Sequence, residues 1–590
     1  SKLISFHDAD IDDQIRRFQE AGFDPERSPR IRAFFQFFRN IMHFPRHLGQ
    51  HSGGMVISLG RLDGVVPIEP ASMDGRTIIQ WDKDDCAELD IVKVDLLGLG
   101  MMAVIRDTLT IIREHKKEEV DLAKIPKDDP LVYKTLQDAD TVGMFQVESR
   151  AQMNFLPKAR PETFYDLVVQ VAIIRPGPIV GNMLNVYLRR RQGLEEVDYM
   201  HPSLKPVLER TLGVPLFQEQ VLKIGMEAAG LTGGEAEELR RALGFKRADK
   251  KLKVIEGKMR VGMTARGLDE ETQNKIVASV YAFANYGFPE SHAASFALLT
   301  YASAYLKVHH LDAFTAAMLN NYPLGFYSPA TLVKDAQRHG LGFRPIDMNE
   351  SDYQCTLEGE ELRIGLNYVK GLRKDTGEAI AAERRNGPFI NADDLAARVP
   401  AVNKRELRGL ALTGALDASD RRRALWQVEL AIREKGSLFA GQTFDQTSKT
   451  PFIRRMSPLE NVAADLSRTG LSLGPHPMTF VRDELNRKRV LTSAETLRMR
   501  RKDVVTVAGA VIVRQRPETA RGVLFITLED ETGFTNVIVL PDVLEKYRSV
   551  INENSFLLIK GIAENETMVK GLYFEPLRVA ETAIVSHDYQ

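Results

Sequence analysis

The chain has 590 residues, of which 44% are hydrophobic and 27% charged, and its formal net charge is −1. A single core rarely grows past ~250–300 residues, so this length predicts several globular domains. No apolar run reaches the ~18 residues that span a bilayer, and the near-zero charge excludes a uniformly basic nucleic-acid coat. Cys86 and Cys355 are the two cysteines and lie far apart, which argues against disulfides or a zinc site and fits a cytoplasmic location.

The first 105 residues mix helix-type and strand-type patterns. Residues 12–41 have helical periodicity, whereas 54–58 and 77–80 are short strand-type runs. From Met101 to about Tyr327 the apolar spacing is helical throughout, with Pro and Gly between the segments. We therefore expect a multidomain α+β protein with a large α-helical domain.

Residues 91–100, Ile-Val-Lys-Val-Asp-Leu-Leu-Gly-Leu-Gly, place Lys93 and Asp95 near the end of an apolar strand. Because successive side chains of a strand alternate between its faces, Lys93 and Asp95 share one face. An acid in such an apolar setting needs a partner. Two interpretations are open: a structural Lys–Asp pair, which the decapeptide alone favours, or a metal or phosphate site.

Two cationic segments stand out in the helical region. Arg175 lies between an apolar helix and a Pro-Gly-Pro stop, which makes it either a carboxylate partner or an anion ligand. Arg240, Arg241 and Lys246 lie close together in sequence and can supply the several cations that a triphosphate needs.

A third segment, Asn285-Tyr-Gly-Phe-Pro-Glu-Ser-His-Ala-Ala294, leads from an aromatic-glycine loop into a helix. Ser291 is either a plain helix cap or a ligand contact. Tyr286 and His292 are either packing residues or contacts for a nucleotide.

Two glycine turns, Val369-Lys-Gly-Leu372 and Leu412-Thr-Gly-Ala-Leu416, separate short helices. In a helix-hairpin-helix element such a turn offers backbone N–H groups to a DNA phosphate. A plain helical hairpin with a glycine cap is the commoner meaning of either turn alone. Two turns in tandem favour DNA binding when a nucleic-acid-binding domain follows.

Beyond Val504 the pattern changes to strand-type runs at 504–513, 522–529, 535–540, 555–561 and 567–574, with a helix-type run at 542–551. Five strands with a helix after the third predict an oligonucleotide/oligosaccharide-binding (OB) barrel, typical of proteins that bind single-stranded nucleic acid. Phe525, Phe534 and Phe556 are either stacking platforms for bases or barrel core, and core is the first choice for most of them.

His43, His47 and His51 have the i, i+4, i+8 spacing of one helix face. Pro45 lies inside the span and would break that helix, so a zinc site is not expected here.

Taken together, these residues resemble the bacterial C-family DNA polymerases, relatives of the polymerase III alpha subunit, over essentially the whole chain. The segments that carry the resemblance are His51-Ser-Gly-Gly-Met-Val-Ile57, 92–99, Phe145-Gln-Val-Glu-Ser149, Arg175-Pro-Gly-Pro178, Phe217-Gln-Glu-Gln220, 239–246 and 286–294. Residues 80–86, 467–477 and 513–517 are similar to the error-prone, ImuC-type translesion branch of that family.

The resemblance implies a domain order. It comprises a partial thumb and palm (1–105), helical fingers (106–345), a helix-hairpin-helix region (346–425), a linker or clamp-proximal region (426–495) and the OB barrel (496–590).

The resemblance also implies residue roles. Asp95 would be the third of three palm aspartates that bind two Mg²⁺ ions. The incoming triphosphate would be held by Lys93, Arg175, Arg240, Arg241 and Lys246, and its sugar and base would be bordered by Tyr286, Ser291 and His292. DNA would be contacted by Lys370, Gly371, Thr413, Gly414, Arg514 and Phe525.

One departure from the family pattern concerns the metal site. The other two catalytic aspartates and the amino-terminal PHP domain of the family lie upstream of every matching segment, and Asp8-Ala-Asp10 stands in helix-type sequence. We therefore expect the chain to be the C-terminal part of a longer protein, with its other magnesium ligands upstream, and unable to polymerise alone.

The expected function is error-prone, translesion DNA synthesis in damage-induced mutagenesis, with primer-template DNA and deoxynucleoside triphosphates as partners and no membrane. A sliding clamp is expected to bind either directly, through Gly436-Ser-Leu-Phe439, or through an accessory Y-family-like protein. A linker with an incidental Leu-Phe is an equal alternative for that segment. A replicative alpha subunit and a non-catalytic DNA-binding scaffold are the competing interpretations of the whole chain.

Overall fold

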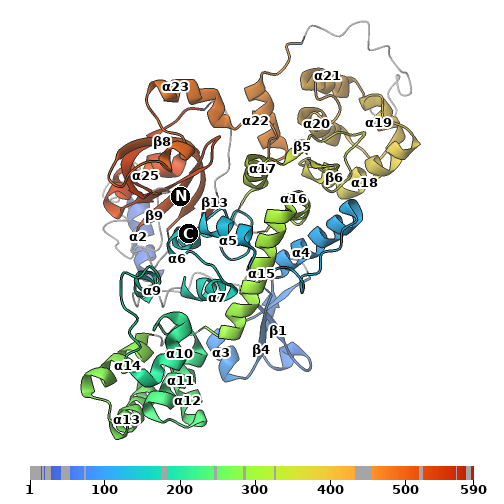
Figure 1. Cartoon of the computed structure of the whole chain (residues 1–590). Coiled ribbons are helices and arrows are strands. Elements are labelled where there is room, and N and C mark those ends of the chain that lie inside the picture. The colour runs from blue at the N-terminus through green and yellow to red at the C-terminus, as the bar shows by residue number, and fades with distance from the viewer. Residues whose placement is uncertain are drawn as a thin grey trace.

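The computed structural model describes residues 15, 19, 28–41, 54–71, 75–96, 98–174, 183–244, 249–282, 288–324, 327–431, 453–516, 522–565, 568–579 and 587–589. Figure 1 shows helices through the centre and bottom of the molecule, a second helical region at the upper right and a barrel at the upper left. None of the described helices is long and apolar enough to cross a bilayer.

The N-terminal region contains two small antiparallel sheets. Its elements are α2 (Pro29–Ile41), β1 (Gly54–Ile57), η1 (Leu62–Gly64), β2 (Ile68–Pro70), β3 (Thr77–Ile79), α3 (Lys83–Glu88) and β4 (Val92–Asp95). β1 pairs with β4 and β2 pairs with β3. The strand-type runs expected at 54–58 and 77–80 are thus strands in the structure.

Helices make up the next region, as the apolar spacing predicts. They are α4 (Leu99–Ile111), η2 (Ile112–Lys116), α5 (Pro130–Gln137), α6 (Arg150–Ala159), α7 (Phe164–Ile173), α9 (Met183–Arg191), η3 (Pro202–Leu204), α10 (Lys205–Leu208), η4 (Glu209–Thr211), α11 (Gln218–Ala229), α12 (Gly233–Gly244), α13 (Asp249–Ala265), α14 (Glu270–Ala282), α15 (Glu290–His309), α16 (Leu311–Asn320) and α17 (Pro329–Arg338). Side-chain caps fix several starts; at α7, Thr163 and Asp166 form a capping box.

The long helix α15 organises this region (Figure 1). It packs against α7 and α5 with small buried residues such as Ala293 and Ala297, and against α4 and α16 with Ala302 and Leu306. Small side chains let neighbouring helices approach closely. A helix of 20 residues is ~30 Å long, so α15 connects regions that lie far apart.

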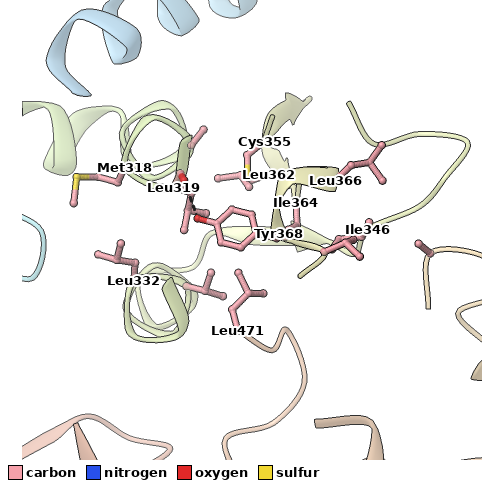
Figure 2. Close-up of a cluster of buried hydrophobic side chains, with 14 of the residues drawn as sticks. Met318, Leu319, Leu332, Ile346, Cys355, Leu362, Ile364, Leu366, Tyr368 and Leu471 are labelled. Carbon is pink, nitrogen blue, oxygen red and sulfur yellow. Dashed lines mark hydrogen bonds between the residues drawn. The ribbon is translucent and has the colours of Figure 1, made fainter. Parts of the chain in front are cut away.

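The second helical region begins with a three-stranded sheet. Its elements are β5 (Gly342–Arg344), β6 (Thr356–Glu358), β7 (Glu361–Arg363), η5 (Leu366–Tyr368), α18 (Lys374–Glu383), η6 (Arg384–Asn386), α19 (Ala392–Arg398), α20 (Lys404–Thr413), α21 (Arg421–Ala431) and α22 (Pro458–Arg468). The core here is continuous with that of α16 and α17. Figure 2 shows Tyr368, whose hydroxyl donates to the Leu319 carbonyl at 2.8 Å, packed among Leu332, Leu362 and Leu471.

The C-terminal region is a closed barrel. Its elements are η7 (Pro477–Val481), α23 (Arg482–Arg487), α24 (Ser493–Thr496), β8 (Val504–Gln515), β9 (Leu524–Glu529), β10 (Phe534–Val539), α25 (Pro541–Glu553), β11 (Phe556–Asn565), β12 (Met568–Pro576) and β13 (His587–Tyr589). Neighbouring strands in the barrel follow the order β11-β12-β10-β9-β8, and the pairing of β11 with β8 closes it. The short strand β13 pairs with β8 in parallel. The OB fold expected from the sequence is confirmed, including the helix after the third strand.

Segments between the helix-hairpin-helix region and the barrel pack onto both neighbours. The Arg421 guanidinium on α21 donates to Asp465 on α22 at 2.6 Å. The Ser493 N–H at the start of α24 donates to Asp530 at 2.7 Å, and the Ser493 hydroxyl lies 2.9 Å from that of Thr535. In its described part, the segment expected to be a linker is therefore held by specific polar contacts.

Candidate functional site

Asp95 is the last residue of β4, and the strand register places it opposite Gly54. Lys93, opposite Val56, lies two positions earlier and is exposed. Directly opposed residues of an antiparallel pair point to the same face, so Met55, Ile57 and Val92 belong to the other face. They are 54%, 55% and 60% exposed. The strand thus has an exposed apolar surface on the face opposite Lys93.

The segment between β4 and α4 approaches α15. A Cβ on Gly98, which follows Asp95 and precedes α4, would stand 3.2 Å from the Leu299 side chain of α15. A side chain at this position would therefore require the Leu299 side chain to move by a few tenths of an ångström. The turn that follows the strand of Asp95 therefore packs against the central helix.

The N-terminal end of α15 is joined to α11. The Gln218 N–H donates to the Phe288 carbonyl at 3.0 Å, and the Glu219 carboxylate accepts from the Glu290 N–H at 2.9 Å. Glu219 supplies a negative charge to the first turn of α15, where the helix dipole favours one.

Ser291 and His292 lie in this first turn. Pro289 is the N-cap of α15, so Ser291 is not the cap, and its side chain is exposed. The His292 ring lies between Phe288 and Phe296, with centroids 4.9 and 4.4 Å away. The packing interpretation of His292 is thus realised, and the residue is half-buried.

Arg240 and Arg241 on α12 share one carboxylate. Glu237 accepts from Arg240 Nε at 2.9 Å and Nη2 at 2.6 Å, and from Arg241 Nε at 3.3 Å. The Arg240 hydrogen bonds, followed by those of Arg241, lower the pKa of Glu237 to about 2. Arg240 Nη1 also donates to Gln218 Oε1 at 3.3 Å. Arg240 is thereby connected through Gln218 to the start of α15.

The structure brings together some of the expected nucleotide contacts and leaves others undescribed. Arg240 is joined through α11 to the turn that contains Ser291 and His292. Arg175, Lys246 and Tyr286 lie outside the described residues, as do the segments 436–439 and 43–51. No role was expected from the sequence for Gln218 and Glu219, which lie in the segment Phe217-Gln-Glu-Gln220, or for Glu237, although Glu237 precedes both arginines at helical i+3 and i+4 spacing.

The two glycine turns differ in exposure. Lys370 and Gly371 are exposed, and Gly371 has a φ of +87°. Lys370 also holds the turn against α22, because its N–H donates to the Arg468 carbonyl at 2.9 Å and its ammonium donates to the Ser467 carbonyl at 3.1 Å. The first turn therefore presents a cation and a glycine backbone to solvent, as phosphate binding requires.

The second turn is buried, which corrects the expectation for Thr413 and Gly414. The Thr413 side chain is 5% exposed and donates to the Leu410 carbonyl. Gly414, at φ +83°, caps α20, and a Cβ there would stand 3.0 Å from Arg421 Nε. Here the glycine cap of a helical hairpin is the better description.

Arg514 of the barrel also differs from expectation. Its side chain is buried, and its guanidinium donates to the carbonyls of Ile551 and Asn554 at 3.0 and 2.7 Å. A cation at these carbonyls supplies hydrogen bonds to backbone C=O groups at the C-terminal end of α25 that have no partner within the helix. Arg514 therefore holds α25 on the barrel with a buried side chain, in contrast to the exposed cation that a DNA contact needs.

The three phenylalanines of the barrel have three different environments. Phe556 is 4% exposed and belongs to the core. The half-buried Phe534 is covered by the Arg338 guanidinium, 4.6 Å from its centroid. Phe525 is half-buried on β9 and is the member of this set that can still stack on a base.

Among the described residues, Asp140, Asp335 and His339 lie close enough together to hold a metal ion. The Lys307 ammonium already lies there, 3.3 Å from Asp140 and 2.9 Å from Asp335. Burial alone lowers the pKa of Lys307, but the two aspartates outweigh it and raise that pKa. A charged amine at this position makes the group an internal ion network. The magnesium hypothesis therefore depends on Asp95, whose strand end offers one carboxylate and needs further ligands.

Four family models match the chain. They are the bacterial DNA polymerase III alpha NTPase domain (residues 1–98), the bacterial DNA polymerase III alpha subunit finger domain (101–267), a helix-hairpin-helix motif (340–425) and an OB-fold nucleic acid binding domain (505–571). The described fold agrees with the last two matches in its tandem hairpins and its closed barrel.

Proteins named error-prone DNA polymerase are similar over most of the chain. The one from Anaeromyxobacter dehalogenans is 47% identical over 93% of this chain and 50% of its own length. Those from Methylococcus capsulatus and Pseudomonas fluorescens are each 44% identical, over 93% and 96% of this chain and 54% and 56% of their own lengths. The chain spans about half the length of these curated relatives. It belongs to the bacterial C-family DNA polymerases, the relatives of DNA polymerase III alpha, and within that family it is of the error-prone type.

Proposed function

We propose that the chain is part of a DNA-directed DNA polymerase that extends a primer 3′-hydroxyl with deoxynucleoside triphosphates during error-prone, damage-induced synthesis. The observation that supports this most is the similarity to error-prone polymerases over 93% or more of the chain. The convergence of α11, α12 and α15 supports it independently, because it joins the arginine pair to the turn that contains Ser291 and His292.

Each part of the proposed site has a task set by its chemistry. Arg240 and Arg241, together with Lys93, bind phosphate oxygens through charge-assisted hydrogen bonds. Arg175 and Lys246 are proposed as further cations of this group. Ser291, His292 and Tyr286 border the sugar and base, and the aromatic packing of His292 fixes the orientation of its ring.

Asp95 is proposed as one ligand of a magnesium pair whose other carboxylates lie outside this chain. Magnesium, when bound, makes the primer hydroxyl a stronger nucleophile and stabilises the pyrophosphate that leaves. The protein's own contribution is the position of Asp95, at the end of a strand whose following turn packs against α15.

DNA contacts are proposed at two places. Lys370 and Gly371 bind a backbone phosphate without reading sequence. Phe525 stacks on an unpaired template base at the barrel. A sliding clamp, bound directly or through an accessory Y-family-like protein, is proposed as a further partner.

The function is tested by primer extension with the longer polymerase expected to contain this chain. Asp95→Asn should abolish synthesis while leaving the folded protein intact, because an amide cannot replace an anionic magnesium ligand. Asp90→Asn is the matched control, since it removes the same charge from an exposed turn at φ +53° that asparagine tolerates. The 590-residue chain alone should not extend a primer. Synthesis that survives in the Asp95 variant would refute the proposed role.

A further inference from the structure

Glu237 holds the two arginines that are proposed to bind the triphosphate. Its carboxylate receives a side-on pair of hydrogen bonds from Arg240 Nε and Nη2, at 2.9 and 2.6 Å, and a third from Arg241 at 3.3 Å. The Nε–Nη2 edge of a guanidinium is also an edge that binds two phosphate oxygens side by side. A carboxylate and a phosphate therefore compete for the same donors.

The cluster is open to solvent. Glu237 and Arg240 side chains are 37% and 35% exposed, and that of Arg241 is 71% exposed. Ion pairs at such positions are weak, because water screens them and each long side chain loses freedom when it is held. A polyphosphate with several negative charges can displace one carboxylate from this position.

Arg240 keeps a second anchor when Glu237 leaves. Its Nη1 donates to Gln218, whose own N–H is bound to the Phe288 carbonyl just before α15. The guanidinium thus stays next to the turn containing Ser291 and His292 while its other edge changes partner. Glu238, the next residue on α12, is exposed, and Arg240 and Arg241 both pair with Glu237 instead.

We propose that Glu237 is a resident counter-ion that occupies the phosphate-binding edge of Arg240 and is displaced by the nucleotide, so that it sets the affinity of the site for polyphosphates. This inference rests on the proposed function, because it assumes that Arg240 and Arg241 bind phosphate. In this role Glu237 determines which anions bind, because an anion must carry enough charge to replace the carboxylate. Triphosphates should therefore bind more tightly than monophosphates.

The test is isothermal titration calorimetry of this chain with dTTP, dTMP and inorganic tripolyphosphate at low ionic strength. Glu237→Gln should tighten dTTP and tripolyphosphate binding about threefold to tenfold, the range expected when two partly exposed ion pairs no longer compete. The same substitution should also reduce the ratio of the affinity for dTTP to the affinity for dTMP. Glu238→Gln makes the same charge change one residue away and should leave both affinities close to those of the unmodified chain.

Three results would count against the inference, and they are distinguishable. Binding that is lost in Arg240→Ala but unchanged in Glu237→Gln refutes the counter-ion role and leaves the proposed function standing. Weaker binding in Glu237→Gln, with an unchanged melting temperature, means that Glu237 positions the arginines and does not compete. Absence of binding in both the unmodified chain and Glu237→Gln refutes the phosphate site itself and the inference with it.

Discussion

Arg338 on α17 and Glu529 on β9 join the helical body to the barrel, through two hydrogen bonds of 3.1 and 3.2 Å from the guanidinium to one carboxylate oxygen. The same guanidinium covers the ring of Phe534. Lys334, one turn earlier on α17, donates to the Gly474 carbonyl at 2.5 Å. A single helix therefore contacts the barrel and the segment that leads to it.

The stability of this junction should depend on pH. Glu529 is fully buried, and burial raises its pKa to about 7 even though Arg338 opposes the shift. A carboxyl whose pKa is raised on folding stabilises the fold most below its unfolded pKa of 4.5, and this contribution is lost as pH rises through 7. The stability of the unmodified chain relative to Glu529→Gln should therefore fall between pH 5 and pH 8.

Thermal unfolding midpoints of both proteins at several pH values measure this difference. His476 acts in the opposite direction: burial lowers its pKa to about 3, so its contribution is lost as pH falls below 6.5. Both proteins contain His476, so its effect cancels in the comparison. A difference that is constant from pH 5 to pH 8 would show that Glu529 does not titrate in this range.

Lys307→Met should destabilise the helical body. The Lys307 side chain is 4% exposed and pairs with Asp140 and Asp335, so its loss leaves the Asp335 carboxylate, 7% exposed, without its nearest cation, while Asp140 keeps His339 as a partner. Breaking such a buried network costs about 3–5 kcal/mol. Chemical denaturation gives the value, and a further Asp335→Asn change should recover part of it by removing the buried charge that lost its partner.

The matched control for that prediction is Lys134→Met. Lys134 pairs with Asp138 on α5 at the surface, where the two side chains are 66% and 53% exposed. Removing an exposed pair of this kind costs at most about 0.5 kcal/mol. Equal effects of the two substitutions would contradict the structural role of the Lys307 network.

Lys370→Gln should weaken binding to duplex DNA without a sequence preference. The lysine is exposed at the first glycine turn, and removal of one phosphate contact lowers the slope of log affinity against log salt by about 1. Fluorescence anisotropy at several salt concentrations measures the slope. Lys124→Gln, which removes an equally charged side chain that is 83% exposed in another region, should leave the slope unchanged.

Phe525→Ala and Phe556→Ala should separate binding from stability in the barrel. The half-buried Phe525 is expected to stack on a base, so its loss should weaken single-stranded DNA binding by about 1–3 kcal/mol at an unchanged melting temperature. Phe556 is in the core, and its truncation should destabilise the barrel by about 3–5 kcal/mol. A Phe525 variant that binds as tightly as the unmodified chain would remove that residue from the DNA interface.

Local pattern predicted most of the secondary structure. The barrel strands and α25 lie within a few residues of the expected ranges, and the described part of the region from Met101 to about Tyr327 is helical as expected. These elements are specified by apolar period and by turn residues, which are properties of neighbouring positions. The cationic pair Arg240 and Arg241 was visible for the same reason.

Polar side chains that reach across the fold could not be assigned from the sequence. Arg514 looks like a DNA contact on an exposed strand, yet it caps α25. Thr413 and Gly414 look like a phosphate-binding turn, yet Arg421 and the end of α20 enclose them. For Arg514 the deciding partners are distant in sequence. For Thr413 and Gly414 the deciding factor is which side of the turn other residues cover.

The sequence by itself determined the family, the element order and the identity of the charged residues, because periodicity, turn chemistry and motif order are local properties. Only the tertiary structure decided which polar side chains meet: Gln218 beside Arg240, Lys307 between two aspartates, and Arg338 against Glu529. Those pairings depend on how α11, α15 and α17 pack, and packing is decided by the shape of cores assembled from segments far apart in the chain.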